Sequence, residues 1–140
     1  MKYFFKTVLL IDDNEIDNIL HEILITKGNF AEQIIVKFSS DDALDFLKDE
    51  AIEKNQIPDL IFLDIRMPLS DGFQFLEAYQ NLPAVILNHT KIVMLTSSLD
   101  DKDHARTIEN KFVQFLLSKP LTIDGLEDLK KKLNTHKLQD

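Results

Sequence analysis

The chain has 140 residues, a formal net charge of −8 and no cysteine. The length fits one domain, and a hydrophobic share of 44% is enough to bury a core, which excludes a disordered chain. The acidic balance argues against nucleic acid and membrane surfaces as partners, since both attract lysine and arginine, and the lack of cysteine excludes disulfides and thiolate metal sites and fits a cytoplasmic location.

Short apolar runs alternate along the chain with apolar stripes at helical spacing. Continuous Val, Ile and Leu runs predict strands covered on both faces, as in a parallel sheet, and the stripes predict helices. In chain order these are the strand Thr7–Ile11, the stripe Ile16–Leu24, the strand Gln33–Phe38, the stripe Ala43–Ala51, the strand Leu60–Leu63, the stripe Phe73–Tyr79, the strand Lys91–Leu95, the weaker helical segment Asp100–Lys111, the strand Phe112–Leu117 and the stripe Ile123–Leu133.

The fivefold alternation of strand and helix predicts an α/β protein with an open, doubly wound parallel sheet. No glycine- or proline-rich linker divides the chain. We therefore expect a single domain over residues 1–140, with a core at about 6–133 and a C-terminal tail at 134–140.

Polar side chains follow four of the predicted strands, where open α/β sheets bind their ligands. Asp12 and Asp13 follow the first strand, Asp64 the third, Thr96 the fourth and Lys119 the fifth. Each alone has an ordinary alternative: the acid pair and the hydroxyl suit helix caps, Asp64 suits a turn and the lysine suits an exposed surface. Because these strand ends share one edge, we expect the five side chains to converge.

Three converging carboxylates repel one another unless a cation lies among them. Oxygen ligands without histidine or cysteine favour a hard cation, and a small number of carboxylates favours Mg²⁺ over Ca²⁺. A carboxylate beside Mg²⁺, a hydroxyl and a lysine is suited to phosphoryl transfer, with the carboxylate as nucleophile.

Over nearly its full length, the chain resembles the response regulator receiver domain of two-component phosphorelays. The matching motifs are Asp12–Asp13, Asp64 in DIRMPLSDG, Thr96 in MLTSS and SKP at Ser118–Pro120. The resemblance implies a flavodoxin-like sheet of five parallel strands in the order 2-1-3-4-5, with five helices.

The resemblance also implies roles at the phosphorylation site. Asp64 is the expected phosphoacceptor, Thr96 is expected to bond a phosphoryl oxygen, and Lys119 is expected to pair with Asp64 or its phosphoryl group. The Lys119–Pro120 peptide is expected to be cis, and Gly72 suits the turn into the following helix.

The expected Mg²⁺ ligands are Asp13, Asp64, the backbone carbonyl of Arg66 and, through water, Asp12. Arg66 and Ser98 occupy positions that vary in the family and tune the lifetime of the phosphoryl group. We expect the side chain of Arg66 to shield or bind that group and to slow dephosphorylation.

One position departs from the family pattern. Leu116 stands three residues before Lys119, where the family usually has Tyr or Phe, and Phe115 points to the opposite face by the alternation of a strand. We therefore expect a modified conformational switch that involves Thr96 and Leu116, with phosphorylation retained.

The implied function is a stand-alone signalling switch, which is not an enzyme on a separate substrate. The phosphodonor is expected to be a sensor histidine kinase or phosphotransfer protein, and the downstream partner is an unknown protein. A homodimer is expected to use the face of Asp100–Lys111, Phe112–Leu117 and Ile123–Leu133.

Two alternatives have a similar architecture. A small Mg²⁺-dependent phosphohydrolase would carry an Asp-x-Asp nucleophile motif after its first strand, whereas the acids here are adjacent. A flavodoxin-like nucleotide binder would need a Gly/Ser/Thr-rich phosphate loop there, and the acidic DDNEID would repel a phosphate. The four histidines lack metal-ligand spacing, and we expect surface or structural roles for them.

Overall fold

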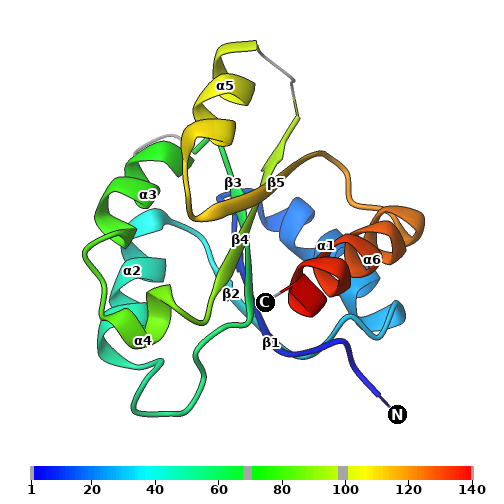
Figure 1. Ribbon diagram of the computed structural model, residues 1–140, viewed down its shortest axis with the longest axis horizontal. Coiled ribbons are helices and arrows are strands. Elements are labelled where there is room, and N and C mark those ends of the chain that lie inside the picture. Colours follow the sequence, from blue (N-terminus) through cyan, green and yellow to red (C-terminus); the bar gives the residue numbers. More distant parts are fainter. Residues whose placement is uncertain (1, 68–70, 98–100, 140) are drawn as a thin grey trace.

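Parallel strands and helices alternate along the chain in this computed structural model, which describes residues 2–67, 71–97 and 101–139 (Figure 1). The strands are β1 (Phe5–Ile11), β2 (Ala31–Lys37), β3 (Leu60–Asp64), β4 (Lys91–Thr96) and β5 (Val113–Ser118). The helices are α1 (Glu15–Lys27), α2 (Ser40–Asp49), α3 (Gly72–Tyr79), α4 (Ala84–Leu87), α5 (Asp101–Glu109) and α6 (Ile123–Gln139). The strand order β2-β1-β3-β4-β5 confirms the predicted fold.

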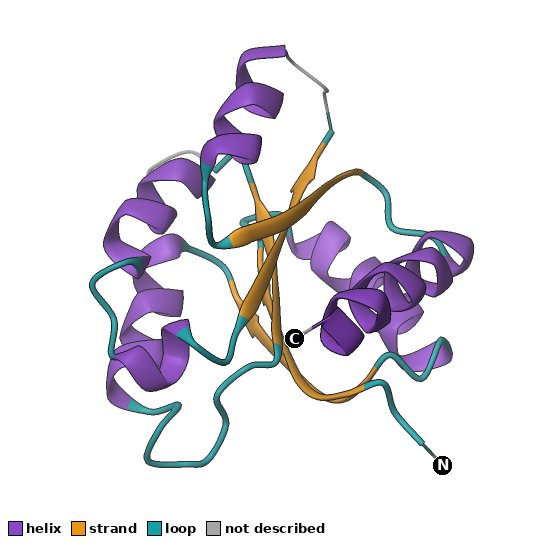
Figure 2. Cartoon of the chain, viewed as in Figure 1, coloured by secondary structure: helices purple, strands orange, loops and turns teal. Residues whose placement is uncertain are grey.

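Helices cover both faces of the sheet (Figure 2). Alternate residues of β1 enter two separate apolar clusters, as the period of a strand requires. Leu9 and Ile11 pack with side chains of α2, α3 and α4, whereas Val8 and Leu10 pack with side chains of α1 and α6. Burial on both faces explains why the strand sequences are continuously apolar.

The expectation of five helices was wrong by one. The additional α4 is a single turn that begins after Pro83, whose φ of −57° is already helical and whose carbonyl accepts hydrogen bonds from the amides of Ile86 and Leu87. Four residues are too few to produce a recognisable apolar stripe. At the C-terminus, α6 continues to Gln139, so most of the segment expected to be a tail is helical.

The helix α1 was predicted, but most of its apolar stripe faces solvent, and Leu24 alone of the stripe packs against the core. The exposed fractions are 68% for Ile16, 51% for Ile19, 48% for Leu20 and 47% for Ile23. The buried side chains of this helix are Asn18, His21 and Ile25. The side-chain amide of Asn18 donates to the carbonyl of Asp12 at 2.9 Å, so the inward side of α1 combines polar contacts with the apolar packing of Ile25.

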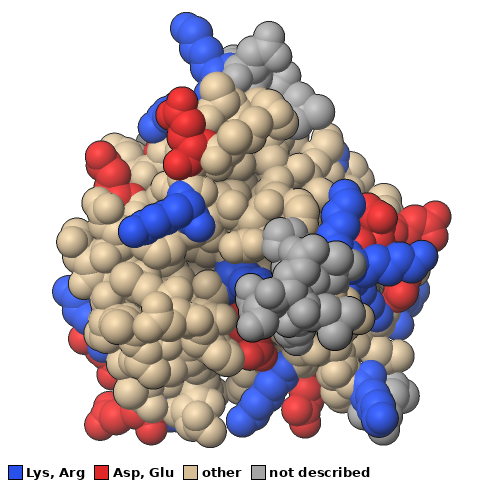
Figure 3. Space-filling model, viewed as in Figure 1, with Lys and Arg blue, Asp and Glu red and all other residues tan. Residues whose placement is uncertain are grey.

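Charged side chains are mixed on the face of the molecule seen in Figure 3, where lysine and arginine stand among aspartate and glutamate. Neither sign forms a continuous patch on the described part of that face. None of the described helices combines the length and apolar character needed to cross a membrane.

Gly72 begins α3 where the chain passes very close to the end of β3. A Cβ atom at this position would lie 2.8 Å from Cε of Met94 and 2.9 Å from the carbonyl oxygen of Asp64. The amide of Gly72 also donates to the carbonyl of Ile65 at 2.9 Å. Glycine is therefore required here by the close approach of two backbone segments.

We predict that Gly72→Ala lowers the free energy of unfolding by about 1–3 kcal/mol, because backbone atoms cannot give way as a flexible side chain can. The control is Gly125→Ala in α6, where the nearest atom to an added Cβ is the Thr122 hydroxyl oxygen at 3.0 Å. Urea denaturation of both variants checks this, and equal effects at the two positions would contradict the close-approach explanation.

Candidate functional site

The predicted site residues do converge at the carboxyl edge of the sheet. Asp64 ends β3 beside Leu95 of β4, and Thr96 ends β4 beside Ser118 of β5. Asp12 directly follows β1, which lies beside the central strand β3. The sheet thus brings together residues that are far apart in the sequence.

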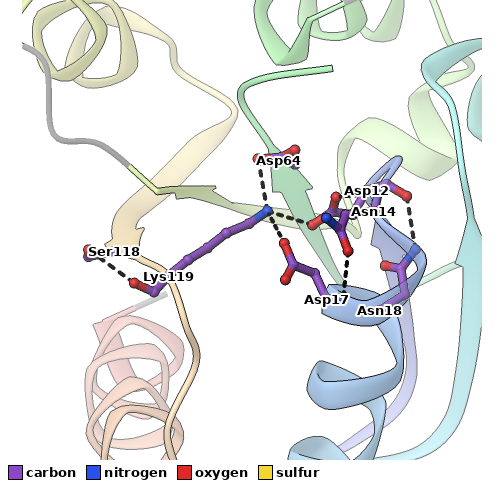
Figure 4. A network of polar contacts seen from close by, with 7 residues as sticks. All are labelled: Asp12, Asn14, Asp17, Asn18, Asp64, Ser118 and Lys119. Atoms are coloured by element: carbon purple, nitrogen blue, oxygen red, sulfur yellow. Dashed lines mark hydrogen bonds and ion pairs between the residues drawn. The ribbon is translucent and has the colours of Figure 1, made fainter. Parts of the chain in front are cut away.

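The Lys119 side chain reaches across this edge and joins three carboxylates (Figure 4). Its Nζ lies 2.7 Å from Oδ2 of Asp12, 2.9 Å from Oδ2 of Asp17 and 3.3 Å from Oδ1 of Asp64. The Lys119 side chain is only 11% exposed, so water screens these contacts weakly. The ammonium group therefore offsets much of the repulsion among the acids.

The backbone fixes the lysine and the first acid in place. The amide of Lys119 donates to the carbonyl of Thr96 at 2.7 Å, and the Lys119–Pro120 peptide is cis, as expected. The amide of Asn14 donates to Oδ1 of Asp12 at 2.9 Å. Asn14 also caps α1 by accepting a hydrogen bond from the amide of Asp17.

Asp17 is a member of this site that the sequence analysis did not identify. It lies in the first turn of α1, where acids are common because they complement the helix dipole. The available signal was its place in the first turn of a helix that begins directly after the acid pair, because that turn starts at the same edge of the sheet. The contact with Lys119 gives this acid a second role beside its favourable interaction with the helix dipole.

The two central groups have shifted pKa values. Burial, followed by the negative charge of Asp12, raises the pKa of Asp64 to about 6, while Lys119 and a hydrogen bond from the Arg66 amide act in the opposite direction. Burial alone would lower the pKa of Lys119, yet its hydrogen bonds to Asp12 and Asp17 and the charge of Asp64 raise it. The lysine is thus held in its charged form beside a carboxylate that is costly to ionise.

Asp12, Asp13 and Asp64 can hold a metal ion together. Each offers one carboxylate oxygen, and these oxygens all lie within 4.8 Å of one another. Asp12 and Asp64 are buried, whereas Asp13 is exposed. Oxygen-only ligands suit a hard divalent cation, and the negative charge of Asp12 adds to burial in raising the pKa of Asp64. The role expected for the Arg66 carbonyl stays a prediction.

The side chain of Arg66 has a partner of its own in this structure, and its expected effect on the phosphoryl group stays a prediction. Its guanidinium group forms an ion pair with the carboxylate of Asp103 in α5. Asp103 was not identified from the sequence, because one aspartate in a charged helix has no distinguishing spacing. Ser98, the other position expected to tune phosphoryl lifetime, lies outside the described residues.

The residues of the expected switch occupy different surroundings. Thr96 is completely buried. Leu116 packs against the cluster under α2 and α3, and Phe115 packs against the opposite cluster, which confirms the predicted alternation. Nζ of Lys132 in α6 lies 5.7 Å from the centre of the Phe115 ring.

One histidine lies close behind the site. His21 is buried in α1, and its pKa is lowered by burial and then by the charge of Lys119. A neutral imidazole at this position adds no second positive charge beside the lysine. This agrees with the structural role expected for the histidines.

Comparison with known proteins is consistent over nearly the whole chain. The family model described as response regulator receiver domain matches residues 8–133. The crystal structure of a two component response regulator from Cytophaga hutchinsonii is 30% identical, has a TM-score of 0.85, and is matched over 96% of this chain and 99% of that chain.

Two further relatives agree. A response regulator receiver protein from Dyadobacter fermentans DSM 18053 is 30% identical with a TM-score of 0.79, over 91% of this chain and 96% of that one. The chemotaxis protein CheY of Halobacterium salinarum is 27% identical over 128 residues, which cover 89% of this chain and 96% of the relative.

The raised pKa of Asp64 gives a pH-dependent prediction. Its folded-state pKa of about 6 exceeds the ordinary 3.8, so the folded chain binds this proton more tightly and loses stability as pH rises from about 4 to above 6. Asp64→Asn cannot ionise. We therefore expect the variant to be more stable than the native chain at pH 7.5 without Mg²⁺, and this advantage to vanish near pH 4.

Urea denaturation across this pH range measures the difference. Asp41→Asn is the control, since Asp41 is an exposed acid in the first turn of α2 and should give no comparable advantage. If Asp64→Asn instead stabilised the chain more at low pH than at pH 7.5, the pKa of Asp64 could not be raised in the folded chain, and the prediction would be contradicted.

Proposed function

The chain belongs to the family of response regulator receiver domains, and from this premise we propose that it is a signalling switch phosphorylated on Asp64. The observation that carries the proposal is the convergence of one lysine on three carboxylates, including Asp64, at the sheet edge. A lysine that was only a solvated surface charge would not be held by three carboxylates at once. The buried position of Asp64 beside a fixed cation suits a nucleophile for phosphoryl transfer.

The proposed reaction needs little from the protein beyond position and charge. An oxygen of the Asp64 carboxylate attacks phosphorus of a phosphohistidine on a partner protein. The new O–P bond forms as the P–N bond breaks, and the electron pair of that bond leaves with the imidazole nitrogen. Lys119 is placed to neutralise charge on the phosphoryl oxygens, and the hydroxyl of Thr96 is proposed to donate to one of them after transfer.

Asp12, Asp13 and Asp64 are the residues proposed to hold Mg²⁺. The ion would supply positive charge next to the transferred group. The protein's own contribution is to keep the carboxylates close together. Asp12 is held by its hydrogen bond from Asn14, and Asp64 by its place in β3.

The exposed apolar stripe of α1, formed by Ile16, Ile19, Leu20 and Ile23, is proposed to bind the phosphodonor protein. The stripe begins two residues after Asn14, the cap that contacts Asp12, and so starts at the phosphorylation site. Four large apolar side chains exposed on one helix mark an interaction surface. A helix of the donor packed along α1 would bring its phosphohistidine near Asp64.

The downstream partner is proposed to recognise the face made by α5, β5 and α6, which a second copy of the chain would share. Phosphorylation is proposed to change this face through Thr96 and α5 more than through Leu116. Leu116 is partly buried against the core cluster and has no polar end to move between core and surface.

The first test is phosphorylation itself. Incubation with acetyl phosphate and Mg²⁺ should add one phosphoryl group, measured by intact-mass spectrometry at neutral pH. Asp64→Asn and EDTA should each abolish the adduct, because they remove the nucleophile or the metal. Asp41→Asn, which changes an exposed acid, should leave it intact. A stable adduct on Asp64→Asn would refute the assignment.

The second test separates docking from chemistry. Ile19→Glu should slow phosphoryl transfer from an autophosphorylated histidine kinase that phosphorylates the native chain by at least about tenfold, because a charge enters an apolar contact. Transfer from acetyl phosphate should be unchanged, since this small donor needs no docking surface. Ile108→Glu on α5 is the control, as Ile108 is 69% exposed and lies on another helix. Equal slowing by both variants would argue against α1 as the docking surface.

A further inference from the structure

Arg66 contacts both the proposed phosphoacceptor and a second, separate carboxylate. Its backbone amide donates a hydrogen bond to Asp64, which opposes the rise in the pKa of that group. Its guanidinium group pairs with Asp103 in α5. The Arg66 side chain is 56% exposed, whereas that of Asp103 is only 6% exposed. One residue therefore connects the phosphorylation site to α5.

The attachment of α5 to the rest of the protein is unusually polar. Among the side chains described in this helix, from Lys102 to Glu109, the buried ones are Asp103 and Thr107. The Thr107 hydroxyl donates to the carbonyl of Asp103 at 2.8 Å and lies 3.8 Å from Sδ of Met94 in β4. The apolar Ile108 is 69% exposed. The described part of α5 thus lacks the buried apolar stripe that anchors most helices.

A buried carboxylate is stable only with a partner, and Asp103 has this partner in Arg66. The second cationic contact near this helix is different in kind, because the guanidinium of Arg106 lies 3.8 Å above the ring of Phe73 in α3. That contact joins an exposed arginine of α5 to a buried ring of the core, and it places no second charge beside Asp103. The Arg66–Asp103 ion pair is thus one of the contacts that hold α5 against the rest of the protein, together with those of Thr107 and Arg106.

We propose that the Arg66 side chain has two positions. It pairs with Asp103 in the unphosphorylated protein, and it leaves Asp103 to bind the phosphoryl group when Asp64 is phosphorylated. The proposal rests on the proposed function. A phosphoryl group brings about two negative charges and three acceptor oxygens, and a guanidinium group binds such an oxyanion in a bidentate manner. The group would be attached to the residue that the Arg66 amide already contacts, so the arginine backbone need not move.

This exchange of partners would transmit the effect of phosphorylation from Asp64 to the surface formed by α5. Once Arg66 leaves, Asp103 loses its cationic partner, and α5 loses one of the contacts that hold it against the rest of the protein. Because that helix has little apolar burial, its local stability falls when the ion pair breaks. This gives the chain a route to change the α5 face that does not require an aromatic residue at Leu116.

The proposal makes opposite predictions for the two partners of the ion pair. In Asp103→Asn, Arg66 is free to bind the phosphoryl group, so the half-life of the phosphorylated protein should lengthen about three- to tenfold. In Arg66→Ala the half-life should shorten. In the double variant Asp103→Asn should have no effect, since the arginine through which it acts is absent.

The protein is phosphorylated with acetyl phosphate and Mg²⁺, the donor is removed, and the adduct is followed by intact-mass spectrometry. Glu109→Gln is the matched control, because it removes an exposed acid from the same helix and should leave the half-life unchanged. If Arg66→Ala does not fold, the double variant replaces it, and its half-life must not exceed that of the native chain.

Amide hydrogen exchange gives an independent readout. Asp103→Asn without phosphorylation should exchange faster over residues 101–109, as the native chain should after phosphorylation, while the amides of β1 and β3 stay protected. If the half-life of the phosphorylated protein is unchanged in Asp103→Asn, or is lengthened equally in the double variant, the proposed movement of Arg66 is overturned and the proposed function is not. Failure of the native chain to form any adduct would instead overturn the proposed function, and this proposal with it.

Discussion

The ammonium group of Lys119 is the interaction on which the carboxyl edge of the sheet depends. Asp12 and Asp64 are buried close together, and their mutual repulsion would oppose folding without a positive charge between them. Lys119 provides that charge from the end of β5, and Asp17 holds it from the other side. In the proposed function the same arrangement would serve the reaction of Asp64, because the ammonium group lies 3.3 Å from its carboxylate and would offset the charge of a phosphoryl group attached there.

Two further features of this edge bear on the charge balance around Asp64: the close approach of the chain at Gly72 and the ion pair of Arg66. Gly72 lets the chain pass close to Asp64 and begin α3 without a clash. Arg66, two residues after Asp64, is paired with Asp103 at the base of a helix that buries little apolar surface. Phosphorylation would therefore add negative charge beside two cations with different attachments, one enclosed by three carboxylates and one half-exposed. The half-exposed cation is the easier one to move.

Strand and helix alternation could be predicted from the sequence because buried strands are continuously apolar, and the site because Asp12, Asp64 and Lys119 follow such strands. The orientation of α1 could not. Most of its apolar stripe faces solvent, and its inward side carries the contact of Asn18 with the Asp12 carbonyl, which periodicity does not reveal. The Arg66–Asp103 pair was missed for a similar reason, since it joins two elements whose packing only the structure defines.

The pairing of Lys119 with the acids can be measured most directly by a carbon-13 NMR titration of the aspartate carboxyl groups without Mg²⁺. The native chain should show Asp64 titrating with a pKa of about 6. In Lys119→Met, which keeps the length of the side chain but removes its charge, the pKa of Asp64 should rise further. An Asp64 that titrates near its ordinary value of about 4, and does not respond to the loss of Lys119, would contradict this account of the site.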